Sequence, residues 1–260
     1  MRLKLFQVDA FTDRRFGGNP AAIVPLERWL PDKTLQAIAA ENNLSETAYF
    51  VKQGERYHLR WFSPVCEVNL CGHATLATAW VLWEKLGERA PLIRFDTRSG
   101  ELRVTREGAW LWLDFPADPA RPCAAPPALV SGLGRPPREV LVARNYVALY
   151  DGEEAVRTLA PDFRVLATLD NHGVIATAPG ANCDFVSRFF APKFGIDEDP
   201  VTGSAHCTLA PLWAERLGRK TLRARQVSRR GGELRCELAG ERVRIGGQAV
   251  AYLAGEIELP

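Results

Sequence analysis

The spacing of apolar residues predicts many short strands and only a few helices. In the first half, alternation or short apolar runs predict strands over residues 3–10, 21–24, 45–51, 56–62, 92–96, 101–105 and 109–115. Helical spacing predicts one helix that begins at Pro31-Asp32 and ends near Asn42-Asn43. In the second half we expect strands over 139–150, 163–178 and 183–190, a short helix near 153–159, and further strands toward residue 260.

Two strongly apolar helical segments, 71–87 and 202–218, resemble each other. At a constant offset of 131, Gly72 aligns with Gly203, and the terminal Leu-Gly of one segment aligns with that of the other. A period of this length is that of a domain, because solenoid units repeat at roughly 20–50 residues. The sequence therefore predicts a duplicated domain with a buried central helix in each half. Two related domains also create a cleft, where ligands bind.

The organisation follows from this repeat and from one break in composition. Residues 116–138 contain seven prolines and are interpreted as the linker between an N-terminal half, 1–115, and a C-terminal half, 139–260. The fold class expected is α+β, with two pseudo-symmetric halves, each a curled, mostly antiparallel sheet around a central helix.

Charge, apolar runs and cysteine content argue against several classes of protein. The net charge is +2, which gives no support for nucleic-acid binding or membrane attraction, and no apolar run is long enough to span a bilayer. The N-terminus has no signal-peptide pattern, and the six scattered cysteines fit no zinc template. We expect a cytoplasmic protein with reduced thiols and without a metal site.

Both repeated helices begin beside a glycine with polar flanks. A helix N-terminus attracts carboxylates, and glycine lets a ligand approach the backbone. Gly72 and Gly203 could instead only relieve packing, but their equivalent positions favour a binding role.

Three titratable residues are candidates for acid–base chemistry. Glu46 lies on an alternating strand with Ala48 and Phe50, where an apolar setting would make it a proton carrier, although an exposed strand-start glutamate remains the simpler alternative. Asp199, just before the second helix, could cap it or face His73 across the cleft.

The sequence resembles the phenazine-biosynthesis isomerase family (PhzF-like) over residues 1 to about 218. The motifs that carry the resemblance are Asp9-Ala10-Phe11, Gly17-Gly18-Asn19-Pro20, Leu44–Ala48, Leu70–Thr75 and Glu198–Ala205. The resemblance implies a diaminopimelate-epimerase-like fold and an isomerase without cofactor or metal. Its characterised member isomerises a dihydro-hydroxyanthranilate by moving a proton between carbons.

The family's catalytic residues correspond to Glu46, His73 and Asp199. Its backbone and hydroxyl contacts to the substrate correspond to Gly72, Gly203 and Ser204, and Asn19, in one of the motifs, is a further candidate for substrate binding. The related epimerases carry a cysteine at the head of each central helix, whereas this chain has Cys71 and Thr202 there. Threonine cannot act as a thiol acid or base, which favours the isomerase.

We therefore predict a cofactor-independent isomerase that moves a proton within a small carboxylated substrate. Glu46 would transfer the carbon-bound proton, while His73 and Asp199 would handle the second proton and the polar substituent. A racemase or epimerase on the same fold and a non-catalytic ligand-binding protein are the alternatives. Neither a nucleic acid nor a membrane is expected as a partner, and a homodimer is left open.

Overall fold

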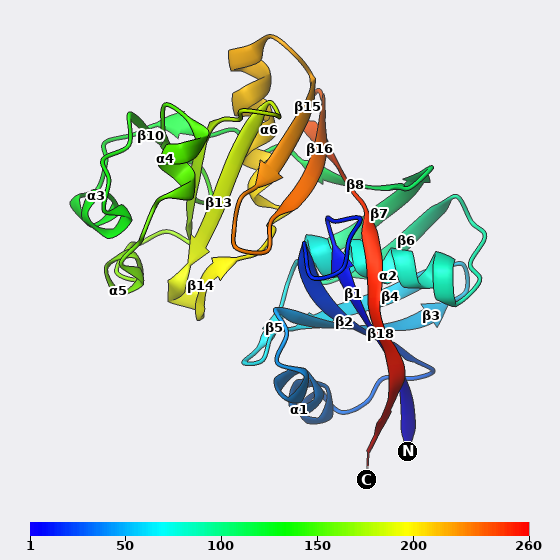
Figure 1. Ribbon diagram of the computed structural model, residues 1–260. Coiled ribbons are helices and arrows are strands. Elements are labelled where there is room, and N and C mark those ends of the chain that lie inside the picture. The colour runs from blue at the N-terminus through cyan, green and yellow to red at the C-terminus, as the bar shows by residue number, and fades with distance from the viewer. Residues whose placement is uncertain (260) are drawn as a thin grey trace. The chain divides into compact units, whose positions relative to one another are not determined.

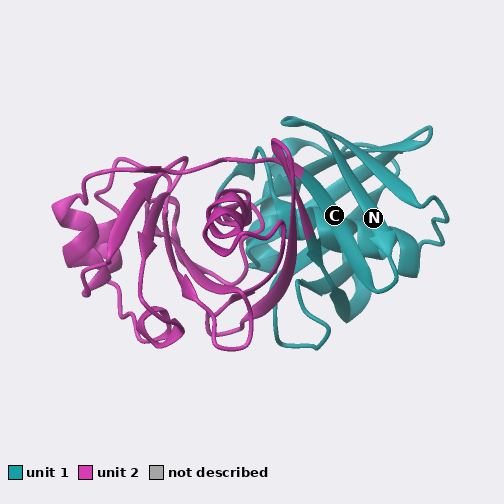
Figure 2. Ribbon diagram, turned by 90° about the horizontal axis from the view of Figure 1, so that it is seen from above, with its two compact units in different colours: residues 1–114, 246–260 teal, residues 115–245 magenta. Residues whose placement is uncertain are grey.

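The chain crosses twice between two units in the computed structural model, which describes residues 1–259. Unit 1 comprises residues 1–114 and the chain from Gly246 onward, and unit 2 comprises residues 115–245 (Figure 2). The chain therefore leaves unit 1 at the end of one strand and returns to it for the last one. No helix of the described residues is both long and apolar enough to cross a bilayer.

Unit 1 is one sheet with a helix on each face (Figure 1). Its elements are β1 (Arg2–Ala10), β2 (Asn19–Leu26), α1 (Asp32–Asn42), β3 (Glu46–Gln53), β4 (Arg56–Phe62), β5 (Glu67–Val68), α2 (Gly72–Lys85), β6 (Leu92–Thr97), β7 (Gly100–Glu107), β8 (Trp110–Pro116, whose last two residues belong to unit 2) and β18 (Ala249–Glu258). The pairings run β18–β1–β2–β3–β4–β6–β7–β8, with β5 added to β4.

Unit 2 repeats this design. Its elements are β9 (Arg121–Pro122), α3 (Pro127–Leu133), β10 (Glu139–Val142), β11 (Tyr146–Leu149), α4 (Glu153–Arg157), α5 (Phe163–Leu166), β12 (Val174–Pro179), β13 (Phe185–Ala191), the 3-10 turn η1 (Pro192–Phe194), β14 (Ile196–Asp199), α6 (Ala205–Leu217), β15 (Thr221–Gln226), β16 (Gly232–Ala239) and β17 (Arg242–Gly247, which ends in unit 1). A helix seen end-on lies within the curled strands of this unit (Figure 2).

The order of parallel and antiparallel pairings supports the duplication. In unit 1, β1 to β7 pair in the order antiparallel, parallel, antiparallel, parallel, antiparallel. In unit 2, β10 to β16 pair in the same order. Each central helix follows a short strand that pairs with the middle of its sheet, β5 for α2 and β14 for α6. The predicted α+β duplicated fold is therefore confirmed.

The two central helices also end in the same way. Gly87 has φ 73° and Gly218 has φ 64°, a left-handed conformation that glycine adopts without the penalty of a Cβ atom. Nine of the fourteen residues of α2 are buried, all of them between His73 and Leu82.

The proline-rich segment is not a linker, which corrects the expected division of the chain. Residues 116–138 contain β9 and α3, and Leu129 and Leu133 lie fully buried in the hydrophobic core of unit 2. Pro127 stands at the start of α3, where its missing N–H costs nothing and its fixed φ suits the helix. Likewise, residues 249–258 do not belong to the second half, because β18 pairs with β1 in unit 1.

The strand expected over 163–178 is also only partly correct. Its first residues form the short helix α5, because the Asp162 carboxylate accepts hydrogen bonds from the backbone N–H groups of Arg164 and Val165. Capping of this kind stabilises a helix start by about 1 kcal/mol. The strand β12 begins only at Val174.

Candidate active site

Two neighbouring parallel strands bring Asn19 and Glu46 to one edge of the sheet in unit 1. β2 begins at Asn19, β3 begins at Glu46, and the register pairs Ala21 with Glu46. Because parallel strands run in the same direction, their first residues lie at the same edge. α2 packs against β1, β2 and β3, and its N-terminus adds Cys71 and His73 to this place.

These four side chains form one buried cluster around the His73 ring. The His73 Nε2 atom lies 3.3 Å from Oε2 of Glu46. On the other side of the ring, Nδ1 lies 3.2 Å from the Asn19 amide nitrogen and 3.5 Å from the Cys71 sulfur. No member of the cluster exposes more than 8% of its surface. Glu46 is therefore buried, and not the exposed glutamate at a strand start that the sequence left open.

The His73 ring is neutral near physiological pH. Burial penalises the charged imidazolium and lowers the pKa of His73 from 6.5 to about 3. The Asn19 amide donates to Nδ1, so the single ring proton resides on Nε2, which lies near the Glu46 carboxylate but makes no hydrogen bond to it. The Glu46–His73 contact is therefore between a carboxyl group and a neutral imidazole, and not an ion pair.

Asn19 is fully buried, and its amide nitrogen lies against Nδ1 of the His73 ring. Its contact with a substrate stays a prediction.

Three atoms of this cluster could also ligate a metal ion. The carboxylate of Glu46, the thiol of Cys71 and the ring of His73 lie within 4.8 Å of one another, and zinc accepts oxygen, sulfur and nitrogen ligands. Glu46 and Cys71, however, approach opposite nitrogens of the ring. The expectation of a metal-free site stays a prediction, which elemental analysis of the purified protein tests.

A second group of candidate residues lies in unit 2, at the start of α6. Asp199 is the last residue of β14, and its Oδ2 atom accepts a hydrogen bond from the Thr202 hydroxyl. Gly203 and Ser204 follow directly and lead into the helix. The Asp199 carboxylate therefore bonds to a side chain of the loop that leads into α6, and the two roles expected for it stay predictions.

Neither central helix has its first turn satisfied by its own side chains. Among residues 1–259, no side-chain capping bond is made at Cys71 or Ser204, the N-cap positions of α2 and α6. Neither helix has an acidic residue in its first turn. Gly72 is the first residue of α2, and both N-termini keep the partial positive charge that attracts anions.

At equivalent positions in the two helices, a side chain donates a hydrogen bond to the backbone carbonyl four residues earlier. The sequence analysis did not predict this similarity. The Thr75 hydroxyl donates to the carbonyl of Cys71 at 2.6 Å. At the same offset of 131, the Nδ1 atom of His206 donates to the carbonyl of Thr202 at 2.9 Å. His206 is fully buried, and burial lowers its pKa to about 4. Its aligned partner is a threonine, so comparing residue types along the repeat could not reveal the match.

The structure thus brings the predicted site residues together in two groups. Glu46, His73, Gly72 and Asn19 form the group in unit 1, and Asp199, Gly203 and Ser204 form the group in unit 2. That the two groups act on one substrate stays a prediction.

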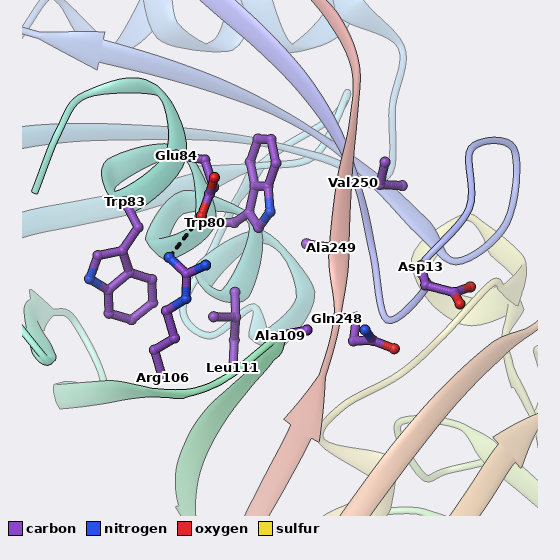
Figure 3. A pocket seen from close by; sticks show the side chains of 10 residues that line it. All are labelled: Asp13, Trp80, Trp83, Glu84, Arg106, Ala109, Leu111, Gln248, Ala249 and Val250. Atoms are coloured by element: carbon purple, nitrogen blue, oxygen red, sulfur yellow. Dashed lines mark ion pairs between the residues drawn. The ribbon is translucent and has the colours of Figure 1, made fainter.

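A separate cavity of unit 1 holds none of these residues. It measures about 270 Å³ and is lined by Trp80, Trp83 and the ion pair of Glu84 with Arg106, whose charged atoms are 2.7 Å apart (Figure 3). These residues come from the last turns of α2 and from β7, whereas the candidate residues lie at the first turn of α2.

Comparison with known proteins shows that the chain is an enzyme of the isomerase class. The chain belongs to the phenazine biosynthesis-like family. The family's sequence model, "Phenazine biosynthesis-like protein", matches residues 8–131 and 135–255.

Known relatives match the chain over its whole length. An uncharacterized isomerase of Pseudomonas aeruginosa is 54% identical, and the match covers all of both chains. The crystal structure of a PhzF-family protein from Enterococcus faecalis, 47% identical, superposes over all of both chains with a TM-score of 0.98. A probable proline racemase from Agrobacterium radiobacter, 13% identical, shares the fold with a TM-score of 0.69 over 99% of this chain and 93% of its own.

Proposed function

We propose that this protein is a cofactor-independent isomerase that moves a proton within a small carboxylated substrate by acid–base catalysis. The observation that carries the proposal is the enclosed Glu46–His73 pair, whose heteroatoms are 3.3 Å apart in a site that water hardly reaches. A carboxyl group held in such a setting can accept a proton from a bound substrate and return it.

Glu46 carries the proton in this mechanism. A substrate C–H bond breaks, Glu46 takes the proton, the electron pair shifts along the substrate's π system, and Glu46 returns the proton to another carbon. Nothing is oxidised or reduced, so the reaction balances as an isomerisation. The Nε2 atom of His73, 3.3 Å from Oε2 of Glu46, orients the carboxylate that takes the proton.

Asp199 handles the polar part of the substrate. Its carboxylate accepts from Thr202 at the N-terminus of α6, in the position where the second thiol of an epimerase would stand. The N-termini of α2 and α6 bind the substrate carboxylate and stabilise charge that develops on it.

A racemase or epimerase is the second candidate, and one contact favours it. The Cys71 sulfur lies 3.5 Å from Nδ1 of His73, close enough for a thiol to exchange a proton with the ring. Its weakness is Thr202, whose hydroxyl cannot serve as the second thiol.

Deuterium incorporation tests the proposal. The purified protein is incubated in D₂O with a metabolite extract and with the dihydro-hydroxyanthranilate as a defined probe, and each acid is examined for a mass increase of one unit. Glu46→Gln should reduce the exchange by ~10²–10⁴-fold, because the amide keeps the size but carries no transferable proton. The matched control is Glu41→Gln, the same substitution at an exposed position on α1.

Two outcomes would overturn the proposal. If the wild-type protein exchanged no carbon-bound hydrogen, the acid–base function would be wrong. If Cys71→Ser abolished exchange while Glu46→Gln retained it, the thiol-dependent epimerase would replace the isomerase.

We also propose a cytoplasmic location. All six cysteines are free thiols, as is usual for proteins of a reducing compartment. Cell fractionation tests the location, and sedimentation of the purified protein decides between a monomer and a homodimer.

A further inference from the structure

A buried glutamine of unit 2 makes three hydrogen bonds to the segment that carries Asp199. Gln226 is the last residue of β15 and is 1% exposed. Its Oε1 atom accepts from the backbone N–H of Thr202 at 2.9 Å. Its Nε2 atom donates to the backbone carbonyl of Asp199 at 2.7 Å and to the Thr202 hydroxyl at 3.3 Å.

A serine two residues later makes a fourth bond to the same segment. The Ser228 hydroxyl donates to the carbonyl of Pro200 at 2.7 Å. The same hydroxyl accepts from the N–H of Gly231 at 3.1 Å, which closes the turn after β15. We call Gln226 and Ser228 together the 226–228 clamp.

The clamp supplies hydrogen-bond partners to the backbone of residues 199–202, as a helix or a sheet does for its own residues. This segment lies between β14 and α6, and its backbone groups at Asp199, Pro200 and Thr202 find partners in the clamp. Buried backbone groups that lose their partners are costly, so the segment is held in this one conformation.

Two hydrogen bonds form a chain that runs from Gln226 through Thr202 to the candidate catalytic carboxylate of Asp199. The amide of Gln226 donates to the hydroxyl of Thr202, and that hydroxyl donates to the carboxylate of Asp199. The hydroxyl is thereby oriented with its proton toward Asp199, since its acceptor side is taken by the amide. Such chains strengthen each member and fix the geometry of the last acceptor.

We propose that Gln226 and Ser228 are positioning residues for the reaction, and that they hold Asp199 and the first turn of α6 in the productive place. This inference rests on the proposed function for its effect on turnover, but the existence of the clamp is tested without any substrate.

Two substitutions break the clamp to different extents. Gln226→Met keeps the approximate length of the side chain and removes three hydrogen bonds, while Ser228→Ala removes one and is the milder change. The control is Leu222→Ala, which removes a fully buried side chain from the same strand without touching the clamp. A fourth variant, Gln226→Glu, keeps the acceptor for Thr202 but places an oxygen where the donor to the Asp199 carbonyl was.

Amide hydrogen exchange of the peptide covering 199–204 measures the clamp directly. We expect Gln226→Met and Gln226→Glu to accelerate exchange there at least tenfold and Ser228→Ala to do so less, with α6 and β16 unchanged. Leu222→Ala should not accelerate this peptide selectively. Unchanged exchange in Gln226→Met would show that no clamp exists.

Steady-state kinetics then measure what the clamp does. A displacement of about 1 Å in a catalytic group can cost ~10²-fold in rate. We expect kcat of Gln226→Met to fall ~10–10²-fold with KM changed less than about threefold, and kcat of Leu222→Ala to stay close to that of the wild type. If exchange accelerated but kcat did not fall, the positioning role would be wrong. A wild-type protein without proton transfer would refute the proposed function, and the amide exchange would still decide the clamp.

Discussion

Acid should destabilise this protein through its two buried histidines. His73 and His206 are neutral in the folded state, because burial lowers their pKa values from 6.5 to about 3 and about 4. The unfolded chain, by contrast, binds a proton on each of them near pH 6.5. A folded pKa below the unfolded one means that stability is complete above pH 6.5 and is lost as the pH falls toward the folded pKa values.

The loss can be estimated from these values. One pH unit between the two pKa values corresponds to about 1.36 kcal/mol per group. Lowering the pH from 7.5 to 5 crosses about 1.5 units below the unfolded pKa, so each histidine removes about 2 kcal/mol from the free energy of unfolding. Both folded pKa values still lie below pH 5, so the folded protein gains almost none of this back.

Urea unfolding followed by tryptophan fluorescence measures the free energy of unfolding of unit 1 at each pH. Six of the seven tryptophans lie in that unit, at positions 29, 61, 80, 83, 110 and 112. We expect the wild type to lose about 2 kcal/mol more than His73→Gln between pH 7.5 and 5. The control, His172→Gln, replaces an exposed histidine and should follow the wild type.

The reasoning is refuted if His73→Gln and the wild type lose stability in parallel. That result would mean that the His73 ring takes up a proton in the folded state, and the neutral tautomer proposed to face Glu46 would then be wrong as well.

Three further substitutions test single contacts. Asn19→Leu should lower kcat at least ~10-fold at nearly constant KM, because His73 loses the amide that fixes its tautomer; unchanged kinetics would contradict that role. Thr202→Val should lower kcat by ~10–10²-fold through the lost donor to Asp199, and Thr202→Ser should restore it; equal activity of the two variants would argue against the contact. Gly18→Ala should cost about 1–3 kcal/mol or more in urea unfolding, since Gly18 has φ 61° and a Cβ atom would lie 2.1 Å from a backbone oxygen; a stability equal to the wild type would disprove this strain.

The sequence predicted the strands and the duplication well because both depend on local patterns. Tyr57, Leu59 and Trp61 alternate along β4 and are all buried, as a period of two requires. The repeat of glycines and apolar residues in 71–87 and 202–218 identified both central helices.

The errors came where local composition and tertiary packing disagree. The prolines of 116–138 suggested a linker, but Leu129 and Leu133, four residues apart, form the apolar face of a helix that packs into the core. Nothing local shows that β18 pairs with β1, because the pairing joins residues about 250 positions apart and depends on the finished sheet.

The candidate site was predictable only where motifs mark it. Glu46, His73 and Asp199 lie in recognisable motifs, whereas Gln226 ends a strand without one. The one signal for Gln226 is its position in the alternation of β15. Leu222 and Ala224 are buried on the inward face of this strand, and Gln226 is a polar residue on the same face.

The return of β18 to unit 1 has a consequence for how the chain acquires its structure during synthesis. Residues 115–245 are continuous, so unit 2 can fold as soon as they leave the ribosome. Unit 1 must wait with one edge of β1 unpaired until residues 249–258 arrive, and an unpaired edge invites pairing between neighbouring nascent chains.

The same pairing places the two ends of the described chain side by side. The N–H of Leu259 donates to the carbonyl of Met1 at 2.8 Å. A short peptide joining these ends, with new ends opened in the exposed hairpin turn at Gly54-Glu55, would make β18 and β1 consecutive strands. Such a circular permutant would let β1 pair with β18 as soon as β1 is made during synthesis.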